Sequence, residues 1–435
     1  MKFDQSKALQ QKSHALIPGG AHTYAKGDDQ YPELAPGFIA RGQGCHVWDV
    51  DGNEFIEYGM GLRAVTLGHA YAPVVDAAAK AMQLGINFTR PTPFEIEAAE
   101  KFLSLIDQME MVKFSKNGSD ANDAAIRLAR AYTGRDLVAV CVDHPFFSVS
   151  DWFIGMTAMN AGIPQAVRDL QVKFHYNDLA SLQALFDQYP NRIACVIMEV
   201  ETATPPKPGF LQGVRDLCTR HGALLIFDEI ITGFRWHNRG AQFIHQIVPD
   251  LCTFGKALGN GYSIAALAGK REFMERGGLN HAQERVFLLS YTFGAESHSL
   301  AAAMAVMEVY EREDVVGHLH RQGERLIRGM TEVIEEHGVQ DYFGLMGKPC
   351  NLVFYTLDRQ GNRSQAFRTL FLQEMIKRGV LGPSLVVSYS HSEEDIDRTI
   401  EAVHGALGVY KQALESGVEK YLVGRPSDVV FRKFN

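Results

Sequence analysis

The 435-residue sequence lacks several patterns that would assign it to a class of protein at once. Its six cysteines are scattered and form no Cys-x-x-Cys pair, so neither a disulfide framework nor a zinc site is indicated. No segment approaches 18 consecutive apolar residues, and the first 20 residues contain no continuous apolar stretch of the secretory kind. We therefore expect a cytoplasmic protein that makes no use of a membrane.

A surplus of positive charge is also missing. The chain has 43 basic and 51 acidic side chains, a formal net charge of −8, and no basic block. This balance argues against electrostatic binding to nucleic acid or to an anionic membrane. Glycine, by contrast, is abundant, with 40 residues. At about 9% of the chain against a usual value of about 7%, it indicates backbone that turns tightly or approaches a ligand closely.

Common nucleotide and metal motifs are absent as well. The P-loop pattern GxxxxGK[ST] does not occur, and Gly259-Asn260-Gly261 lacks the third glycine of a dinucleotide fingerprint. The histidines form no HExxH or similar pattern, so we expect no bound metal. Any cofactor must be recognised by a different arrangement of residues.

The order of the segments indicates an α/β protein. An N-terminal helix should stop at Pro18-Gly19-Gly20, and residues 38–58 alternate apolar and polar around Asp51-Gly52, which predicts an antiparallel meander. From about residue 70, helical stretches alternate with short apolar runs, which predicts a mostly parallel sheet covered by helices. The runs are MVKFSKN, DLVAVCVD, RIACVIMEV, ALLIFDEI, PDLCTFGK and AALAG.

Three segments that follow these runs carry a coherent set of functional groups. Ligands of open α/β sheets bind beyond the carboxyl ends of the strands. Asn117-Gly118-Ser119-Asp120 precedes a helix with a small apolar stripe from Ala121 to Tyr132, and a helix start of this kind binds phosphate well. The alternative is that Ser119 or Asp120 only caps the helix.

The second segment is Asp228-Glu229 at the end of the run ALLIF. A carboxylate buried there needs a cation, and Arg235 could serve Glu229 in a structural ion pair. The third is Gly255-Lys256, which follows PDLCTF. A lysine that loses solvent there becomes a usable amine nucleophile, although a solvent-exposed loop lysine is the alternative.

One cofactor explains all three segments. Pyridoxal phosphate (PLP) needs a lysine for a Schiff base, a carboxylate for its pyridine nitrogen and a phosphate site at a helix start. An aromatic residue should also stack on its ring, and His144-Pro145-Phe146-Phe147 supplies candidates. We therefore predict that the chain is a PLP enzyme.

Eight motifs support this interpretation through a resemblance. In chain order they are IPGG (17–20), WDVDGNEFIEY (48–58), LGHA (67–70), NGSDANDAAIRLARAYTGR (117–135), FDEIITGFR (227–235), FGKALGNG (254–261), YTFG (291–294) and HSEEDID (391–397). Together they resemble the class III PLP aminotransferases of fold type I, and most of all the glutamate-1-semialdehyde aminomutase branch. The resemblance extends from about residue 16 to residue 410.

The resemblance implies a role for particular residues. Lys256 would hold the cofactor and move the substrate α-proton, and Asp228 would pair with the pyridine nitrogen. The other cofactor-binding residues would be Gly118, Ser119, Asp120, Phe146, Glu199, Ile230 and, from the second subunit of a homodimer, Thr292. Phe146-Phe147 stands where relatives commonly have Tyr-His, so the stacking ring is kept but a hydroxyl and an imidazole are lost.

The residues expected to bind the substrate differ from those of the aminomutase. Lys26, in Thr23-Tyr24-Ala25-Lys26, stands where the aminomutase has a carboxylate-binding arginine, and lysine is not equivalent to arginine there. Leu62 replaces a tryptophan, and Val387 replaces a glutamate. The candidates for substrate binding are Thr23, Lys26, Arg63 and Trp152.

We therefore predict a PLP-dependent aminotransferase that moves an amino group from an amino donor to a carbonyl acceptor. The alternatives are an aminomutase that moves nitrogen within one substrate, a non-catalytic cofactor-binding protein and a nicotinamide dehydrogenase. The expected organisation is a large cofactor domain at 70–315, with a small α+β domain built from 1–69 and 316–435.

Overall fold

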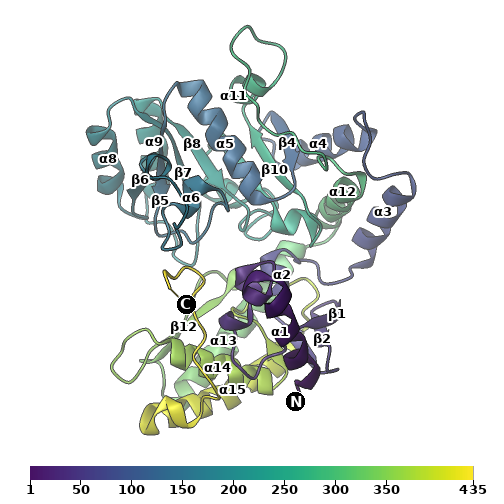
Figure 1. The fold of residues 1–435 in the computed structure, drawn as a ribbon, viewed down its shortest axis with the longest axis vertical. Coiled ribbons are helices and arrows are strands. Elements are labelled where there is room, and N and C mark those ends of the chain that lie inside the picture. Colours follow the sequence, from purple (N-terminus) through teal and green to yellow (C-terminus); the bar gives the residue numbers. More distant parts are fainter. Residues whose placement is uncertain (435) are drawn as a thin grey trace. The chain divides into compact units, whose positions relative to one another are not determined.

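The structure is a computed structural model that describes residues 1–434 (Figure 1). The chain divides into two compact units. The central unit comprises Ala72–Val316, and the terminal unit comprises Met1–Tyr71 and the described residues from Gly317 onward. No helix within the described residues is both long enough and apolar enough to cross a membrane.

A seven-stranded sheet forms the middle of the central unit, in the order β4-β10-β9-β8-β7-β5-β6. The strands are β4 (Met111–Ser115), β5 (Leu137–Cys141), β6 (Gln171–Phe174), β7 (Ile193–Glu199), β8 (Leu224–Asp228), β9 (Leu251–Phe254) and β10 (Ala265–Gly269). Strands β6, β5, β7, β8 and β9 run parallel, and β10 is antiparallel to β9 and β4. The predicted mostly parallel sheet is confirmed.

Helices and loops join these strands. The central unit contains α3 (Ala72–Gln83), α4 (Pro93–Leu105), α5 (Gly118–Thr133), α6 (Asp151–Ile154), α7 (Gln165–Arg168), α8 (Leu179–Gln188), α9 (Phe210–His221), α10 (Ala241–His245), η4 (Lys256–Gly259), α11 (Arg271–Met274), η5 (Glu275–Gly277) and α12 (Ser297–Arg312). Helix α5 packs on β7, β9 and β10, as Figure 1 shows, and α12 packs against α3 and α4. Because helices cover the sheet, every residue of β5, β7, β8, β9 and β10 is buried.

Helix α5 shows how the sequence sets the start of a helix. The side chain of Asn117 accepts a hydrogen bond from the backbone N–H of Asp120 (3.0 Å), so Asn117 is the N-cap. Gly134 ends the helix in the left-handed conformation, with φ of 65°. The predicted stripe is buried from Ala121 to Ala129, but Tyr132 is 38% exposed and packs edge-on against Phe273 instead.

The terminal unit combines both ends of the chain. Its larger sheet has the order β1-β2-β3-β13, and a second sheet pairs β11 with β12. The strands are β1 (Ile39–Gln43), β2 (His46–Asp49), β3 (Glu54–Glu57), β11 (Phe343–Met346), β12 (Val353–Thr356) and β13 (Val380–Leu381). Strands β1, β2 and β3 form the predicted antiparallel meander, and β13 runs parallel to β3 with Val380 opposite Ile56.

Helices complete the terminal unit. They are α1 (Asp4–Leu16), α2 (Met60–Arg63), α13 (Val315–His337), α14 (Gln365–Lys377) and α15 (Glu393–Ser416), with the short helices η1 (Pro18–Gly20), η2 (Tyr24–Lys26), η3 (Asp28–Gln30), η6 (Pro349–Asn351) and η7 (Val418–Lys420). Helix α1 ends just before Pro18, as predicted. The predicted small α+β unit built from both ends of the chain is confirmed.

Candidate active site

Asp228 lies at the carboxyl end of β8 and is 3% exposed. Its Oδ1 accepts the backbone N–H of Ile230 (2.9 Å), and its Oδ2 accepts the side-chain N–H of Asn122 (2.8 Å). Burial raises the pKa of Asp228 to about 6, although these two hydrogen bonds and the charge of Lys256 act in the opposite direction. A buried carboxylate of this kind is stabilised by a cationic partner.

Asn122 is a site residue that the sequence did not reveal. It is fully buried on α5, where its Oδ1 accepts from Thr253 Oγ1 (2.7 Å) and its Nδ2 donates to the carbonyl of Phe147 (2.7 Å) as well as to Asp228. These contacts fix the amide, so that one of its two N–H groups faces the carboxylate. An asparagine within an alanine-rich buried stripe is the one signal that could have drawn attention to it, because buried polar groups require partners.

Lys256 begins η4 and is separated from the end of β9 by Gly255 alone. Its side chain is partly buried, and its charge lowers the pKa of Asp228, which places the two groups within electrostatic reach. Its backbone has φ of 44°, in the left-handed region that lysine rarely adopts. Such a conformation costs about 1–3 kcal/mol and is found most often at functional sites.

The Ile230 side chain lies close to both the start of α5 and the residue before Lys256. A Cβ atom added to Gly118 would lie 2.7 Å from Cδ1 of Ile230, and one added to Gly255 would lie 3.2 Å from the same atom. The Ile230 side chain therefore packs between the glycine that begins α5 and the glycine that precedes Lys256. Neither glycine could become a larger residue unless Ile230 moved.

The start of α5 offers free backbone donors. Asn117 caps the helix and bonds the N–H of Asp120, so the interpretation that Ser119 or Asp120 is the cap is wrong. The Ser119 hydroxyl accepts the N–H of Val149 (3.1 Å), and the Asp120 carboxylate accepts from Asn117 Nδ2 (2.8 Å). The first-turn N–H groups of Gly118 and Ser119 lie at the positive end of the helix dipole, which suits an anion.

Glu199 lies beside Asp228, because the two are register partners on β7 and β8. It is 4% exposed, and its backbone N–H donates to Nδ1 of His144 (3.0 Å). Burial lowers the pKa of His144 to about 4, so the ring is neutral at pH 7 and Nδ1 is free to accept.

Neighbouring Glu229 is fully buried, as is Arg235, and Glu229 accepts the N–H groups of Ala241 and Gln242 at 2.8 and 2.7 Å.

The loop after β5 presents the aromatic residues. Phe146 is 43% exposed and packs edge-on against Phe153, with ring centroids 5.4 Å apart, whereas Phe147 is buried. Trp152 is 7% exposed, and its indole N–H donates to Asp123 (2.6 Å). The indole thus ties the loop to α5, and its one polar group is already used.

The other predicted residues lie elsewhere. Thr292 is exposed in the central unit, and its carbonyl accepts from Asn87 Nδ2 (2.7 Å). Thr23, Lys26 and Arg63 belong to the terminal unit. Thr23 and Lys26 are exposed at the two ends of η2, and Arg63 donates to the side chains of Asn351 (2.8 Å) and Ser384 (3.3 Å).

The residues of the central unit fit PLP. Asp228 is a buried acceptor with a raised pKa that a pyridinium N–H would stabilise, and the Gly118 helix start suits a phosphate. A lysine, a strand-end aspartate and an anion site on a mostly parallel sheet define a PLP-dependent enzyme of fold type I. The chain belongs to the class III aminotransferases, because the model of the family "Aminotransferase class-III" matches residues 27–407. The predicted class, cofactor and activity are thereby confirmed.

Individual proteins similar to this chain include members with different activities. A glutamate-1-semialdehyde 2,1-aminomutase of Desulfitobacterium hafniense is 32% identical, with 93% of this chain and 98% of the relative covered. A 3-aminobutyryl-CoA aminotransferase of Cloacimonas acidaminovorans is also 32% identical, with 95% and 99% covered. The structure of the PLP internal aldimine form of the FumI protein of Sphingopyxis sp. MTA144 superposes with a TM-score of 0.87, at 26% identity, with 97% of this chain and 98% of that chain covered.

Proposed function

We propose that this enzyme transfers an amino group between two separate substrates, an amino donor and a carbonyl acceptor, with Lys256 as the residue that carries the chemistry. The observation behind the proposal is the strand-end pair of Lys256 and Asp228, whose charges interact across neighbouring strands β9 and β8. PLP, when bound, supplies the electron sink that makes the substrate α-proton removable. The Nζ of Lys256 would hold the cofactor and would carry that proton to and from the substrate.

The surrounding residues orient the cofactor. Asp228 would accept the pyridinium N–H, and the Phe146 ring and the Ile230 side chain would pack on the cofactor ring. The backbone N–H groups of Gly118 and Ser119 would bind the phosphate, with Asp120 beside them. Glu199 lies next to Asp228, where its carboxyl group contributes to the ring pocket.

The active protein is a homodimer in this proposal, with Thr292 completing the phosphate site of the partner subunit. Support comes from the exposed Thr292 and from the apolar side chains exposed near it in the chain: Phe287 is 70% exposed and Phe293 is 60% exposed. Exposed aromatic residues of this density are typical of surfaces that a protein partner covers.

Transfer between two substrates is favoured over aminomutase chemistry by three residues. Lys26, Leu62 and Val387 replace the arginine, tryptophan and glutamate that mark the aminomutase. The substrate would carry an anionic group, bound by Arg63 or Lys26, with Thr23 and Trp152 as further contacts. The bonds from Arg63 to Asn351 and Ser384 hold the guanidinium in one orientation, which is the arrangement that carboxylate recognition requires.

Lys256→Ala tests the role of the lysine. We expect the visible absorbance of the bound cofactor and the turnover to disappear together, because both depend on the amine at this position. Lys173→Ala is the matched control: this exposed lysine of the same unit donates to the carbonyl of Met156, and its loss should change neither signal. Undiminished turnover in Lys256→Ala contradicts the proposal.

A panel of amino donors distinguishes the two reactions. The purified yellow enzyme is mixed with single amino compounds, including carboxylate-bearing amino acids and ω-amines, and the cofactor absorbance is followed without any carbonyl acceptor. Intermolecular transfer predicts stoichiometric bleaching by a suitable donor and recovery on addition of an acceptor. Conversion of a single substrate to product with no separate donor would instead show an aminomutase.

A further inference from the structure

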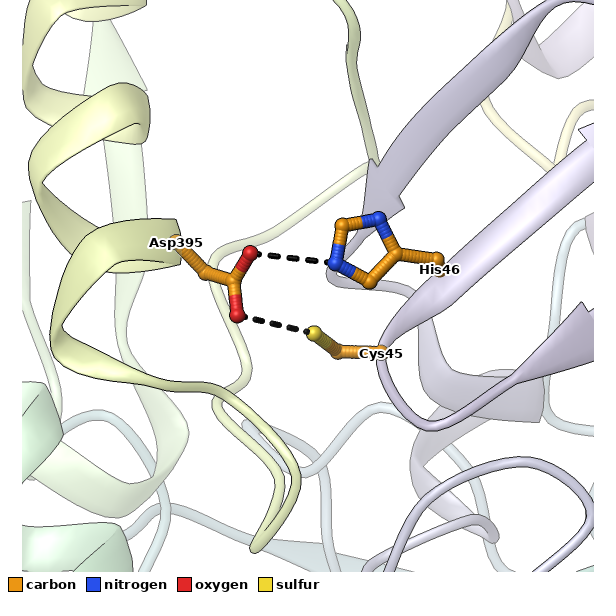
Figure 2. A group of neighbouring side chains, drawn as sticks. All are labelled: Cys45, His46 and Asp395. Atoms are coloured by element: carbon orange, nitrogen blue, oxygen red, sulfur yellow. Dashed lines mark hydrogen bonds and ion pairs between the residues drawn. The ribbon is translucent and has the colours of Figure 1, made fainter.

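A second cluster of reactive side chains lies in the terminal unit, apart from the lysine and aspartate of the candidate active site. Figure 2 shows Cys45 and His46, at the start of β2, facing Asp395 in the first turn of α15. Sγ of Cys45 lies 3.4 Å from Oδ2 of Asp395, and Nε2 of His46 lies 3.1 Å from Oδ1. One ligand atom from each residue lies within 4.8 Å of the other two.

These separations suit a metal ion. Zinc binds Cys sulfur at about 2.3 Å and His nitrogen or carboxylate oxygen at about 2.0–2.2 Å, so neighbouring ligand atoms of a tetrahedral site are about 3.3–3.6 Å apart. The 3.1 Å between Nε2 of His46 and Oδ1 of Asp395 is close to these values, and Sγ of Cys45 lies within 4.8 Å of both other ligand atoms. Thiolate, imidazole and carboxylate together favour a borderline transition-metal ion and disfavour Mg²⁺ or Ca²⁺, which prefer oxygen ligands alone.

The residues behind the ligands supply independent support. Nδ1 of His46, the ring nitrogen that faces away from Asp395, lies 2.9 Å from Oε1 of Glu54 on β3. A metal-binding histidine almost always directs its second ring nitrogen to a carboxylate or carbonyl, which fixes the ring and leaves the first nitrogen free for the metal. Nδ1 makes no hydrogen bond in this structure, but Glu54 lies near enough to accept one from it once an ion fixes the ring.

Hydrogen bonds also hold the Asp395 carboxylate in place. Oδ2 of Asp395 accepts the N–H and the hydroxyl of Ser392, at 3.0 and 2.7 Å, in the capping box of α15. The Cys45 thiol is therefore a third donor to an oxygen that already has two. Oδ1 has only the His46 contact among the hydrogen bonds found in the described residues, so it remains available as the metal ligand.

We propose that Cys45, His46 and Asp395 form a zinc-binding site that links the β1–β2 turn to helix α15. Binding displaces the thiol proton of Cys45 to solvent and selects the neutral His46 tautomer with its proton on Nδ1, and three bonds from Sγ, Nε2 and Oδ1 replace the two hydrogen bonds. A water molecule takes the fourth position. Because the ligands come from segments 350 residues apart in the chain, the ion stabilises the terminal unit.

The holoenzyme itself provides the first test. The protein is treated with a chelator, the chelator is removed, and the protein is dialysed against increasing Zn²⁺. Atomic emission measures the amount of bound zinc, and X-ray absorption identifies its ligands. We expect one saturable ion per chain, with a single sulfur at about 2.3 Å and lighter ligands at about 2.0 Å. The midpoint of thermal unfolding of the protein should rise with zinc concentration. No saturable zinc, or bound zinc without a sulfur ligand, overturns the proposal.

Variants separate this site from adventitious binding. Cys45→Ser keeps a hydroxyl donor for Asp395 but should weaken zinc binding at least 100-fold. Glu54→Gln, at a half-exposed position that does not touch the ion, should weaken it 10–100-fold. Cys350→Ser is the control, because Cys350 is a buried cysteine of the same unit outside the cluster, and it should bind zinc as the parent does. Equal affinity for zinc in Cys45→Ser and the parent also overturns the proposal.

Discussion

The side-chain amide of Asn122 donates a hydrogen bond of 2.8 Å to the carboxylate of Asp228, and Thr253 and the carbonyl of Phe147 hold that amide in place. Helix α5 and strands β8 and β9 therefore contribute jointly to the orientation of one carboxylate. The carboxylate that we propose as the acceptor for the pyridine nitrogen is thus oriented by the protein's own contacts. These hydrogen bonds stabilise the buried carboxylate of Asp228.

Asn122→Ala should weaken cofactor binding. Hydrogen bonds to charged groups contribute about 1.5–3 kcal/mol, so the dissociation constant of PLP should rise about 10–100-fold. Titration of the apoenzyme with PLP, followed by absorbance, measures it. Gln183→Ala is the control, because Gln183 also donates an amide hydrogen bond to an aspartate, Asp187, but on the surface of α8. If Asn122→Ala and Gln183→Ala bind PLP equally well, Asn122 does not position Asp228.

Asp228→Asn should separate binding from chemistry. The amide cannot stabilise a protonated pyridine nitrogen, so the cofactor stays bound while α-proton transfer slows by orders of magnitude. Single-turnover bleaching with excess amino donor measures this step. Asp143→Asn, which changes an exposed carboxylate just beyond β5 in the same sheet, should leave the rate unchanged. An unaltered rate in Asp228→Asn would assign the role to another carboxylate.

The packing of Ile230 between two glycines predicts a compensating pair of substitutions. Gly118→Ala alone should weaken PLP binding about tenfold, because its Cβ would lie 2.7 Å from Cδ1 of Ile230 and push that side chain toward the ring site. Ile230→Val removes Cδ1. In the Ile230→Val background, Gly118→Ala should therefore cost much less affinity. A double-mutant cycle measures the coupling, and additive effects would show that the contact is not the cause.

His144 predicts a specific loss of stability in acid. Its pKa in the folded protein is about 4, against 6.5 for an ordinary histidine, so folding favours the neutral ring. The stabilisation that the neutral His144 ring gives the folded protein is complete above about pH 6.5 and is lost as the pH falls toward 4. At pH 4.5 the loss should be roughly 2–3 kcal/mol of unfolding free energy relative to pH 7.5.

His144→Asn provides the comparison, because its side-chain oxygen can accept the N–H of Glu199 without titrating. Urea unfolding at several pH values should show a shallower acid dependence for this variant than for the parent. His175→Asn, at an exposed histidine of the same unit, should follow the parent curve. Parallel curves for His144→Asn and the parent would rule out this origin of the acid sensitivity.

The proposal that Thr292 completes the phosphate site of a partner subunit predicts complementation between two inactive chains. Lys256→Ala lacks the amine, and Thr292→Ala lacks the residue that we assign to the partner's site. In a mixed dimer, the chain with Lys256 intact receives Thr292 from the Lys256→Ala chain, so one complete site forms. Mixing and refolding the two variants should restore up to about a quarter of the parent activity, because half of the dimers are mixed and each has one complete site. Light scattering should show dimers throughout, and a monomeric parent would exclude the arrangement.

Much of the fold could be predicted because its strands are short, apolar and buried. Strand β6 was missed because it is an edge strand of four residues that includes the exposed Lys173, so its pattern is not that of a covered strand. The end of the α5 stripe was also misjudged. Tyr132 fits the spacing of a buried face, but its ring packs edge-on against Phe273 of α11 and stays partly exposed.

The candidate site was predictable to a similar extent, and for a physical reason. Strand ends of a parallel sheet lie on one edge, so Asp228 and Lys256 could be expected to lie near each other from chain order alone. Asn122 could not be found in this way, because its partners become apparent only once α5 has packed on the sheet. The same holds for Cys45 and His46, whose neighbour Asp395 lies in a different region of the sequence.

The parallel pairing of β13 with β3 has a consequence for folding during synthesis. The central unit is one continuous segment, so it can form as soon as its last residues leave the ribosome. Strand β3 is made before that unit and must wait for Val380 and Leu381, which are made long after it. Until then the β1–β3 meander has an open edge, and the nascent chain is most exposed to aggregation there. A ribosome pause before residue 380 would therefore lengthen the period of risk for the terminal unit without delaying the central one.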